Sequence, residues 1–353
     1  MQRYSRQTLL PEIGTDGQRQ LLASSVLCIG AGGLGCASLP YLVGAGVGRI
    51  VIVDPDRIER DNLQRQVLYG EADLGQAKAE VAARRLADLN PDIRIEAVSE
   101  RLDTDNIERL LEACDLIIDG SDNYPTKYLA GDASIKFDVP LIYGSATGME
   151  AMVTVFAPGR GPCLRCLFPQ APQGWVPNCN EAGVLGPLVG LAGAAQAVEA
   201  IKLLSGSDTQ SLIGRLWMCD ARDLSIRTLA IRRRADCRTC SQPPESIELA
   251  RSEKQIREIT AEELAGIDDA TFIDVREADE FVAGHIPGAV NLPLSRIQQS
   301  PPTSIPTGTL VLYCRTGPRA VAAATTLKGR GIGNIYCLRG SLAAWRGDLE
   351  SER

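Results

Sequence analysis

Two pairs of cysteines have the spacing of a metal-binding site. One pair is Cys163 and Cys166, and the other is Cys237 and Cys240. Each CxxC turn can present two thiolates to one ion, and four thiolates complete the closed, tetrahedral coordination of structural zinc. Redox chemistry at one CxxC is the alternative, but two pairs flanked by turn residues favour zinc. The single histidine, His285, lies in a turn, and we interpret it as stabilising that turn rather than acting as a base.

Cys314 has the sequence surroundings of a reactive thiol. It directly follows the apolar run Leu310–Tyr313 and precedes a loop that contains Arg315 and Arg319. Pro318 suits the first position of a helix, so Cys314 is expected just before a helix N-terminus. The helix end and the two arginines would both favour the thiolate, and the loop amides could hold an anion attached to the sulfur. A buried cysteine at a strand end is the alternative.

Cys179 lies in the segment between the two cysteine pairs. Residues 169–187 contain three prolines before Cys179 and show no periodicity, which indicates an irregular loop. Free cysteine is usually buried, so a cysteine in a polar loop beside Glu181 is a candidate for chemistry. Its position alone does not distinguish it from an incidental thiol.

A glycine-rich turn indicates a nucleotide site near the N-terminus. The apolar run Val26–Ile29 fits a buried parallel strand, and the sequence GAGGLG follows it at residues 30–35. After a helix-like segment, a second apolar run, Ile50–Val53, ends in Asp54. This pattern predicts a βαβ unit in which glycines let the backbone approach a phosphate and a helix N-terminus attracts its charge. A tight turn without a ligand is the alternative.

Other polar residues could complete such a site. The loop 61–66, with the sequence DNLQRQ, carries several hydrogen-bonding groups, and Lys78 begins a helix-like segment. Asp122 closely follows the apolar run Leu116–Ile118, at the strand end where open α/β sheets bind ligands. It could instead cap the helix that begins near Pro125, and the two roles are compatible.

Length, charge and apolar patterning limit the possible architectures and partners. The 353 residues suffice for two domains, and a net charge of −7 without a long basic tract argues against nucleic acid. The longest apolar tract, Val184–Leu204, contains glutamine, glutamate and lysine, so we interpret it as a buried helix rather than a membrane span. Because the N-terminus lacks a signal pattern, we expect a cytoplasmic protein.

Alternating apolar runs and helix-like segments predict α/β folds on both sides of a polar linker. We expect one domain over residues 1–242, a linker over 243–258 and a smaller domain over 259–353. Strands are expected at 26–29, 50–53, 93–98, 116–118, 141–143, 151–156, 272–275 and 310–313, and helices at 76–89, 105–113 and from 318.

The motifs of the two predicted domains resemble those of two known families. Residues 1 to about 240 resemble the MoeB/ThiF adenylyltransferases, relatives of ubiquitin-activating enzymes, through RYSRQ, GAGGLG, DPDRIERDNLQRQ, GQAKAE, DGSDN, CLRC, NCNEAGVLGP and CRTC. Residues from about 259 to 350 resemble a rhodanese domain through IDVREADEF, GHIPGAVNLP and CRTGPR. The resemblance implies a Rossmann-like adenylation domain with a four-cysteine zinc site, followed by a smaller α/β sulfurtransferase domain.

The resemblance also implies residue roles. ATP would be bound by Gly30, Gly32, Gly33, Asp54, Asn62, Gln64, Arg65, Lys78 and Asn123. Asp122 would hold Mg²⁺, and Arg6 would reach the phosphates bound by the partner subunit of a homodimer. Zinc would be bound by Cys163, Cys166, Cys237 and Cys240, Cys179 would be the family's loop cysteine, and Cys314 would carry a persulfide.

Three positions depart from the family patterns, and one spacing separates rhodanese domains from related phosphatases. Asp61 stands where serine is expected, and Lys127 where arginine is common, and both look tolerable. Pro318 removes one amide donor from the rhodanese loop. Related phosphatases have one residue more between cysteine and arginine, so the spacing from Cys314 to Arg319 favours sulfur over phosphate.

The function implied is ATP-dependent adenylation of a ubiquitin-like sulfur carrier with a C-terminal Gly-Gly, followed by sulfur transfer from Cys314. A cysteine desulfurase or thiosulfate would be the sulfur donor. Cys179 could form a thioester with the carrier or cleave an acyl-disulfide, and the sequence does not separate these routes. The carrier could serve molybdopterin, thiamine, cysteine, siderophore or tRNA-thiolation chemistry.

Two other functions remain open from the sequence. An NAD-dependent dehydrogenase with a sulfur-binding domain is compatible with the glycine turn, but Asn62, Arg65 and Lys78 suit a triphosphate better. The other is a non-catalytic scaffold for a ubiquitin-like protein. The presence of Asp122, Cys179 and Cys314 argues against it, because a scaffold needs none of them.

Overall fold

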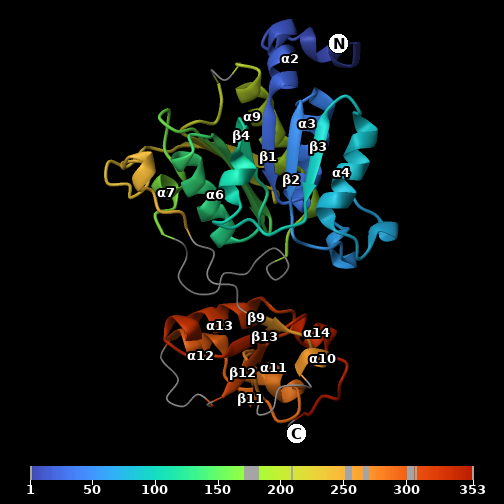
Figure 1. The fold of residues 1–353 in the computed structure, drawn as a ribbon, viewed down its shortest axis with the longest axis vertical. Helices are drawn as coiled ribbons and strands as arrows, with labels where there is room; N and C mark the ends of the chain where they lie inside the picture. The colour runs from blue at the N-terminus through green and yellow to red at the C-terminus, as the bar shows by residue number, and fades with distance from the viewer. Residues whose placement is uncertain are drawn as a thin grey trace. The chain divides into compact units, whose positions relative to one another are not determined.

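The computed structural model describes residues 2–170, 183–207, 210–250, 257–264, 270–299, 306 and 308–351. They form two compact units (Figure 1). The first unit contains the described residues up to Ala250, and the second contains those from Arg257 onward. The first unit therefore extends beyond residue 242, because 243–250 belong to it.

The first unit is built on an eight-stranded sheet with the strand order β3-β2-β1-β4-β5-β6-β7-β8. The strands from β3 to β5 pair in parallel, and β6 to β8 add antiparallel pairs. Their bounds are β1 Ser25–Ile29, β2 Arg49–Val53, β3 Arg94–Val98, β4 Leu116–Asp119, β5 Leu141–Thr147, β6 Glu150–Phe156, β7 Arg215–Asp220 and β8 Ser225–Ala230.

Helices cover both faces of this sheet, because the parallel strands are apolar on both sides. One core contains side chains of α3 (Gly33–Ala45), α4 (Lys78–Leu89) and α9 (Gly186–Leu204). The opposite core contains side chains of α5 (Ile107–Leu111) and α6 (Tyr124–Lys136). The remaining short elements are η1 (Gln2–Tyr4), α1 (Ser5–Thr8), α2 (Gly14–Ala23), η2 (Arg60–Asn62), η3 (Glu71–Asp73), α7 (Leu164–Leu167) and η4 (Pro244–Ser246).

Helix α9 is long and apolar enough, by length and composition, to cross a membrane. Half of its most apolar window is buried within the protein, and the helix packs against α3, β5 and β6. Gln196 is fully buried and donates to the backbone oxygen of Asp119 at 2.8 Å. The helix is therefore a core element of the first unit, as the polar residues within its apolar sequence predicted.

The second unit is a parallel five-stranded sheet with the order β11-β10-β12-β13-β9. Helices α12 and α13 pack on one face, and α10 and α14 contribute to the other. The bounds are β9 Arg257–Ile259, α10 Ala261–Leu264, β10 Ala270–Asp274, α11 Ala278–Ala283, β11 Val290–Asn291, α12 Leu294–Gln299, β12 Thr309–Tyr313, α13 Pro318–Gly329, β13 Ile335–Leu338 and α14 Ser341–Ala344.

Two predicted elements differ most in length from the observed ones, and the others differ by one or two residues at their ends. Helix α5 is shorter than the predicted 105–113, and Ala113 adopts a positive φ of 57°, which a continuing helix does not allow. Strand β5 continues beyond the predicted 141–143 to Thr147, because it forms a hairpin with β6. The added residues 144–147 include glycine and alanine, which are depleted in strands, so the local sequence does not indicate them as part of β5.

Candidate active site and metal centre

The glycine turn after β1 leads directly into the N-terminus of α3, and its glycines differ in how closely other atoms approach them. Gly30 has a φ of +90°, and a Cβ there would lie 3.0 Å from the backbone of Gly120, which follows β4. A Cβ at Gly35 would lie 2.2 Å from the oxygen of Gly30, so the helix starts directly on the turn. At Gly32, the N-cap, the nearest atom would be 3.8 Å away. Backbone N–H groups at this helix end can therefore receive an anion.

Asp54, immediately after β2, orders the same turn. Its carboxylate accepts hydrogen bonds from the amides of Ala31 at 2.7 Å and Asp56 at 2.8 Å. Burial raises the pKa of Asp54 above its usual value, and the nearby Lys78 ammonium opposes that rise. Lys78, the buried first residue of α4, donates to Asp56 at 3.0 Å. An acid and an ammonium group thus lie beside the glycine turn.

Tyr69 is a component of this site that carries no sequence signal. Its buried hydroxyl donates to the backbone oxygen of Ala31 at 2.7 Å and lies 3.2 Å from that of Lys78. The tyrosine therefore connects the glycine turn to the start of α4. Neither its type nor its spacing from the glycines indicates this contact.

The polar loop 61–66 lies against the glycine turn, as expected for residues of one site. A Cβ at Gly33 would lie 3.5 Å from the backbone oxygen of Arg65. Asn62 is buried, and its backbone oxygen accepts from the amide of Arg65 at 3.1 Å. The exposed Gln64 lies beside the start of α9, where a Cβ at Gly186 would be 2.5 Å from its backbone oxygen. The loop therefore lies between the N-termini of α3 and α9.

Asp122 and Asn123 follow β4 in the segment that adjoins the glycine turn. Asp122 is exposed. Asn123, not Asp122, is the N-cap of α6, because its side-chain oxygen accepts from the amide of Thr126 at 3.0 Å. The capping role considered for Asp122 therefore belongs to its neighbour, and the Asp122 carboxylate remains available at the edge of the sheet.

A buried ion pair involves Asp119, the last residue of β4, three residues before Asp122. Lys127 donates to Asp119 at 2.9 Å and to the backbone oxygen of Gly144 at 2.8 Å. The other oxygen of Asp119 accepts from the amide and the hydroxyl of Ser121, at 2.9 and 2.6 Å. Burial is the largest single effect on the pKa of Lys127 and lowers it. The charge and hydrogen bond of Asp119, together with the nearby Tyr143, outweigh burial, so the pKa lies above its usual value. This network fixes the backbone that carries Asp122.

Arg6 does not join the glycine turn of its own chain. It is exposed on α1. The neighbouring Gln7 donates to the backbone oxygen of Ala45, at the opposite end of α3 from Gly33. A helix of this length spans about 20 Å, which separates Arg6 from the turn.

The four cysteines of the two CxxC pairs meet in one cluster in the first unit. All four sulfur atoms lie within 4.8 Å of one another. Cys163 Sγ is 3.4 Å from Cys237 Sγ, and Cys166 Sγ is 3.5 Å from Cys240 Sγ. Tetrahedral zinc with a Zn–S distance of about 2.3 Å separates its sulfurs by roughly 3.8 Å. Burial, reinforced by the other thiols, raises the pKa of Cys163. The sulfur spacing, close to that of a four-thiolate zinc site, is what suits the cluster to a metal ion.

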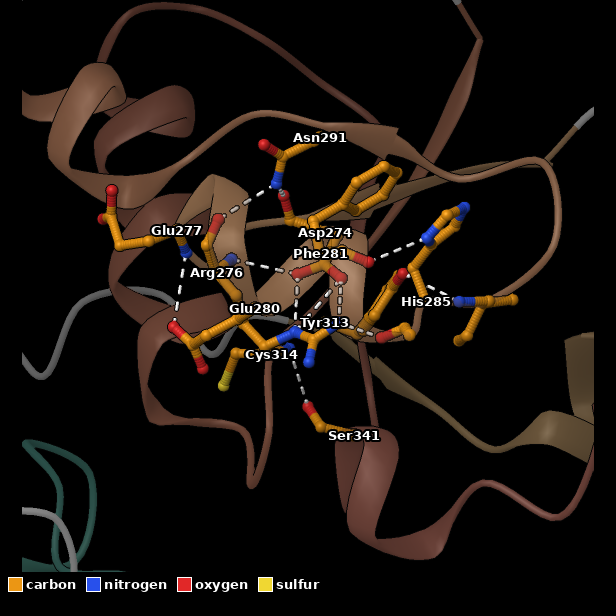
Figure 2. Close-up of polar contacts among 12 residues, drawn as sticks. Asp274, Arg276, Glu277, Glu280, Phe281, His285, Asn291, Tyr313, Cys314 and Ser341 are labelled. Atoms are coloured by element: carbon orange, nitrogen blue, oxygen red, sulfur yellow. Dashed lines mark hydrogen bonds and ion pairs between the residues drawn. The ribbon is translucent and has the colours of Figure 1, made fainter. Parts of the chain in front are cut away.

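Cys314 lies in the second unit at the end of β12 and immediately before α13, as predicted (Figure 2). It is buried, and its sulfur accepts a hydrogen bond from the amide of Gly317 at 3.1 Å. Its own amide donates to the hydroxyl of Ser341 at 3.3 Å. The loop thus holds the sulfur next to a helix N-terminus, where negative charge is stabilised.

The two arginines of this loop differ in their surroundings. Arg319 forms a bidentate ion pair with Glu280, at 2.6 and 2.8 Å, which holds the pKa of Glu280 below its usual value. Arg315 is exposed. The positive charge expected from Arg319 is therefore compensated by Glu280 on α11, a partner distant in sequence.

His285 is buried in the turn after α11. Its ring stacks on Phe281 with centroids 3.7 Å apart, and Nδ1 lies 2.9 Å from the backbone oxygen of Phe281 (Figure 2). The contacts agree with a turn-stabilising role. Cys179, the remaining predicted site residue, lies outside the described residues.

Comparison with known proteins identifies both parts of the chain. The ThiF family matches residues 4–239, and the rhodanese-like domain matches residues 260–348. The chain belongs to the ThiF family. It is an adenylyltransferase joined to a sulfurtransferase, since relatives that cover nearly all of it combine these two activities in their names.

Three of its relatives illustrate this match. The chain is 36% identical to "Adenylyltransferase and sulfurtransferase MOCS3" of Aedes aegypti, covering 99% of this chain and 87% of the relative. It is 38% identical to "Probable adenylyltransferase/sulfurtransferase MoeZ" of Mycobacterium tuberculosis, with coverage of 99% and 94%. The first part is 45% identical to the "Sulfur carrier protein adenylyltransferase" of Thermus thermophilus, over 70% of this chain and 94% of that protein.

Solved structures with a similar fold include that of E. coli MccB with ATP. That structure has a TM-score of 0.60 and 23% identity, covering 68% of this chain and 75% of MccB. At this identity the match supports the fold alone. The dehydrogenase alternative finds no support in these matches.

Proposed function

We propose that this ThiF-family enzyme adenylates the C-terminal glycine of a ubiquitin-like sulfur carrier and then converts the adenylate to a thiocarboxylate. The observation that carries the proposal is the convergence of three groups at one sheet edge. They are the α3 N-terminus, the loop 61–66 and the exposed Asp122. This arrangement offers amides and cations to phosphates and a carboxylate to a metal ion.

ATP would lie over Gly30, Gly32 and Gly33, with its ribose at Asp54. Asn62, Gln64, Arg65 and Lys78 would bind and neutralise the phosphates. The carrier's carboxylate oxygen attacks the α-phosphorus, the bond from that phosphorus to the bridging oxygen breaks, and pyrophosphate leaves with its electron pair. The protein contributes positioning and charge stabilisation, not a covalent intermediate.

Asp122 fits a magnesium ion, because it is an exposed carboxylate on a fixed backbone. The side-chain oxygen of Asn123 already caps α6, so its contribution beside Asp122 is chiefly to position that carboxylate. Mg²⁺ would supply charge neutralisation to the phosphates. The four-cysteine cluster fits zinc in a structural role, with no open position for catalysis.

Cys314 would carry sulfane sulfur taken from a cysteine desulfurase or from thiosulfate. The terminal sulfur of its persulfide attacks the acyl carbon of the adenylate, and AMP leaves. The product is an acyl-disulfide between the carrier and Cys314. The amide of Gly317, 3.1 Å from the Cys314 sulfur, supports negative charge at this position.

Cys179 has two possible roles in releasing the product. In one, its thiolate attacks the sulfur of Cys314, the thiocarboxylate leaves, and an external thiol reduces the resulting Cys179–Cys314 disulfide. In the other, Cys179 first displaces AMP to form a thioester. The persulfide attacks this thioester and expels the Cys179 thiolate, which gives the same acyl-disulfide. Attack by the freed Cys179 or an external thiol on the Cys314 sulfur then releases the thiocarboxylate. The chemistry of a cysteine thiol permits both routes.

The proposal includes a cytoplasmic homodimer in which Arg6 of one subunit reaches the phosphates in the other. The distance along α3 between Arg6 and its own glycine turn supports this arrangement. No partner among nucleic acids or membranes is proposed.

Exchange of label between pyrophosphate and ATP tests the adenylation step. We expect exchange that depends on a carrier with an intact Gly-Gly end, because reversal requires the acyl-adenylate. A carrier without its last glycine is the matched control and should give background exchange only. Exchange that is independent of every candidate carrier would contradict the proposal.

A further inference from the structure

Asp132 on α6 is a buried carboxylate that is not a predicted metal ligand. It is 1% exposed and accepts two hydrogen bonds from Arg165, each of 2.6 Å. It also accepts from the hydroxyl of Thr239 at 3.3 Å and from the amide of Ala250 at 3.1 Å. Four donors from three separate segments therefore meet at one side chain.

Two of these segments are the cysteine pairs themselves. Arg165 lies between the cysteines of the first CxxC, and Thr239 lies between those of the second. Gly131, which precedes Asp132, permits this approach, because a Cβ there would lie 2.6 Å from Leu164. Asp132 therefore orients both cysteine turns at once, from a position outside the sulfur cluster.

The third segment, 247–250, is not a sequence neighbour of either turn. Ile247 is buried in one apolar cluster with Ile135 and three of the four cysteines. Lys136, at the end of α6, donates to the backbone oxygen of Ile247 at 2.8 Å. Ala250, the last described residue before the second unit begins, completes the attachment through Asp132. The segment therefore packs against the cysteine cluster.

We propose that Asp132 is a positioning residue that couples metal binding by the four cysteines to attachment of segment 247–250 on α6. The inference rests on the proposed zinc site. Groups around metal ligands orient them and commonly change metal affinity by about 10–100-fold. Coupling between two binding events is reciprocal, so loosening the segment weakens metal binding, and removing the metal loosens the segment.

Ala250→Pro tests this coupling without changing a ligand or Asp132. Proline removes the amide hydrogen that Asp132 accepts. The rate of zinc transfer from the whole protein to a chromogenic chelator is expected to rise about tenfold. Glu248→Pro is the matched control, because its amide makes no hydrogen bond among the described residues and Ile247 has an extended ψ of 113°, which suits a following proline.

Metal analysis of the wild type tests the zinc site separately from the coupling through Asp132. About one zinc per chain is expected, and its absence from folded protein would contradict the zinc site itself. If zinc is present but Ala250→Pro and Glu248→Pro release it at equal rates, the coupling is overturned. Should Ala250→Pro not fold, Thr239→Val removes a different donor to Asp132 and should also accelerate release.

Hydrogen exchange gives the reciprocal measurement. Removal of zinc from the wild type should accelerate exchange at the amide of Ala250, while the β1 amide of Leu27 keeps its protection. Equal protection of Ala250 with and without zinc would overturn the coupling. Loss of protection at both amides would also overturn it, because the metal would then stabilise the whole unit rather than this segment.

Discussion

Replacing Cys314 by alanine is expected to abolish transfer of sulfur from thiosulfate to cyanide. The reason is that the substitution removes the atom that carries the sulfane sulfur, and no second route exists in the proposed mechanism. Pyrophosphate exchange should remain at the wild-type level, because Cys314 lies in the second unit and adenylation uses residues of the first. Both activities are measured on the full-length chain.

Cys337→Ala is the matched control for this variant. Cys337 lies in the same unit on β13, and burial raises the pKa of its thiol to about 12. It is therefore not ionised at neutral pH and cannot replace Cys314 as a nucleophile. Sulfur transfer that survives in Cys314→Ala would contradict the assignment. Loss of both activities in Cys314→Ala would show that the two reactions are not separable.

Replacing Asp122 by asparagine is expected to lower pyrophosphate exchange by at least about a hundredfold. Asparagine keeps the size of the side chain but removes the charge proposed to hold Mg²⁺ beside the α-phosphate. Because Asp122 does not cap α6, the change should leave thermal stability nearly unaltered. Thiosulfate sulfur transfer should also be unchanged.

Asp105→Asn is the corresponding control. Asp105 is another exposed carboxylate of the first unit, in the turn before α5, and its neutralisation should leave exchange unchanged. A Mg²⁺ titration distinguishes the expected cause from a loss of folding. If Asp122→Asn exchanges label as fast as Asp105→Asn does, Asp122 has no role in adenylation.

Much of the site could be predicted because its residues lie next to local sequence signals. The glycine turn follows an apolar strand, Cys314 stands between a strand and Pro318, and the CxxC spacing defines two halves of one cluster. Each signal depends on neighbours only a few residues away. The strand ends of a parallel sheet then bring Asp54 and Asp122 to the same edge.

The interactions that could not be predicted join residues far apart in sequence. Tyr69 contacts the glycine turn, Glu280 compensates Arg319, and Asp132 joins Arg165, Thr239 and Ala250. Tyrosine, glutamate and aspartate are common residues, and their partners are set by packing rather than by spacing. The attachment of residues 243–250 to the first unit could not be predicted for the same reason. Their polar, proline-containing sequence is typical of a linker and does not reveal that Ile247 and Ala250 are attached to α6.

In the proposed mechanism the two units act in sequence on one carrier. Its most direct test is the mass of the carrier's C-terminus after incubation with the full-length enzyme, ATP, Mg²⁺, thiosulfate and a thiol reductant. The account predicts that one oxygen of the terminal carboxylate is replaced by sulfur, and that Cys314→Ala and Asp122→Asn each prevent the change. An unmodified carrier, or a thiocarboxylate formed equally well by Cys314→Ala, would contradict it.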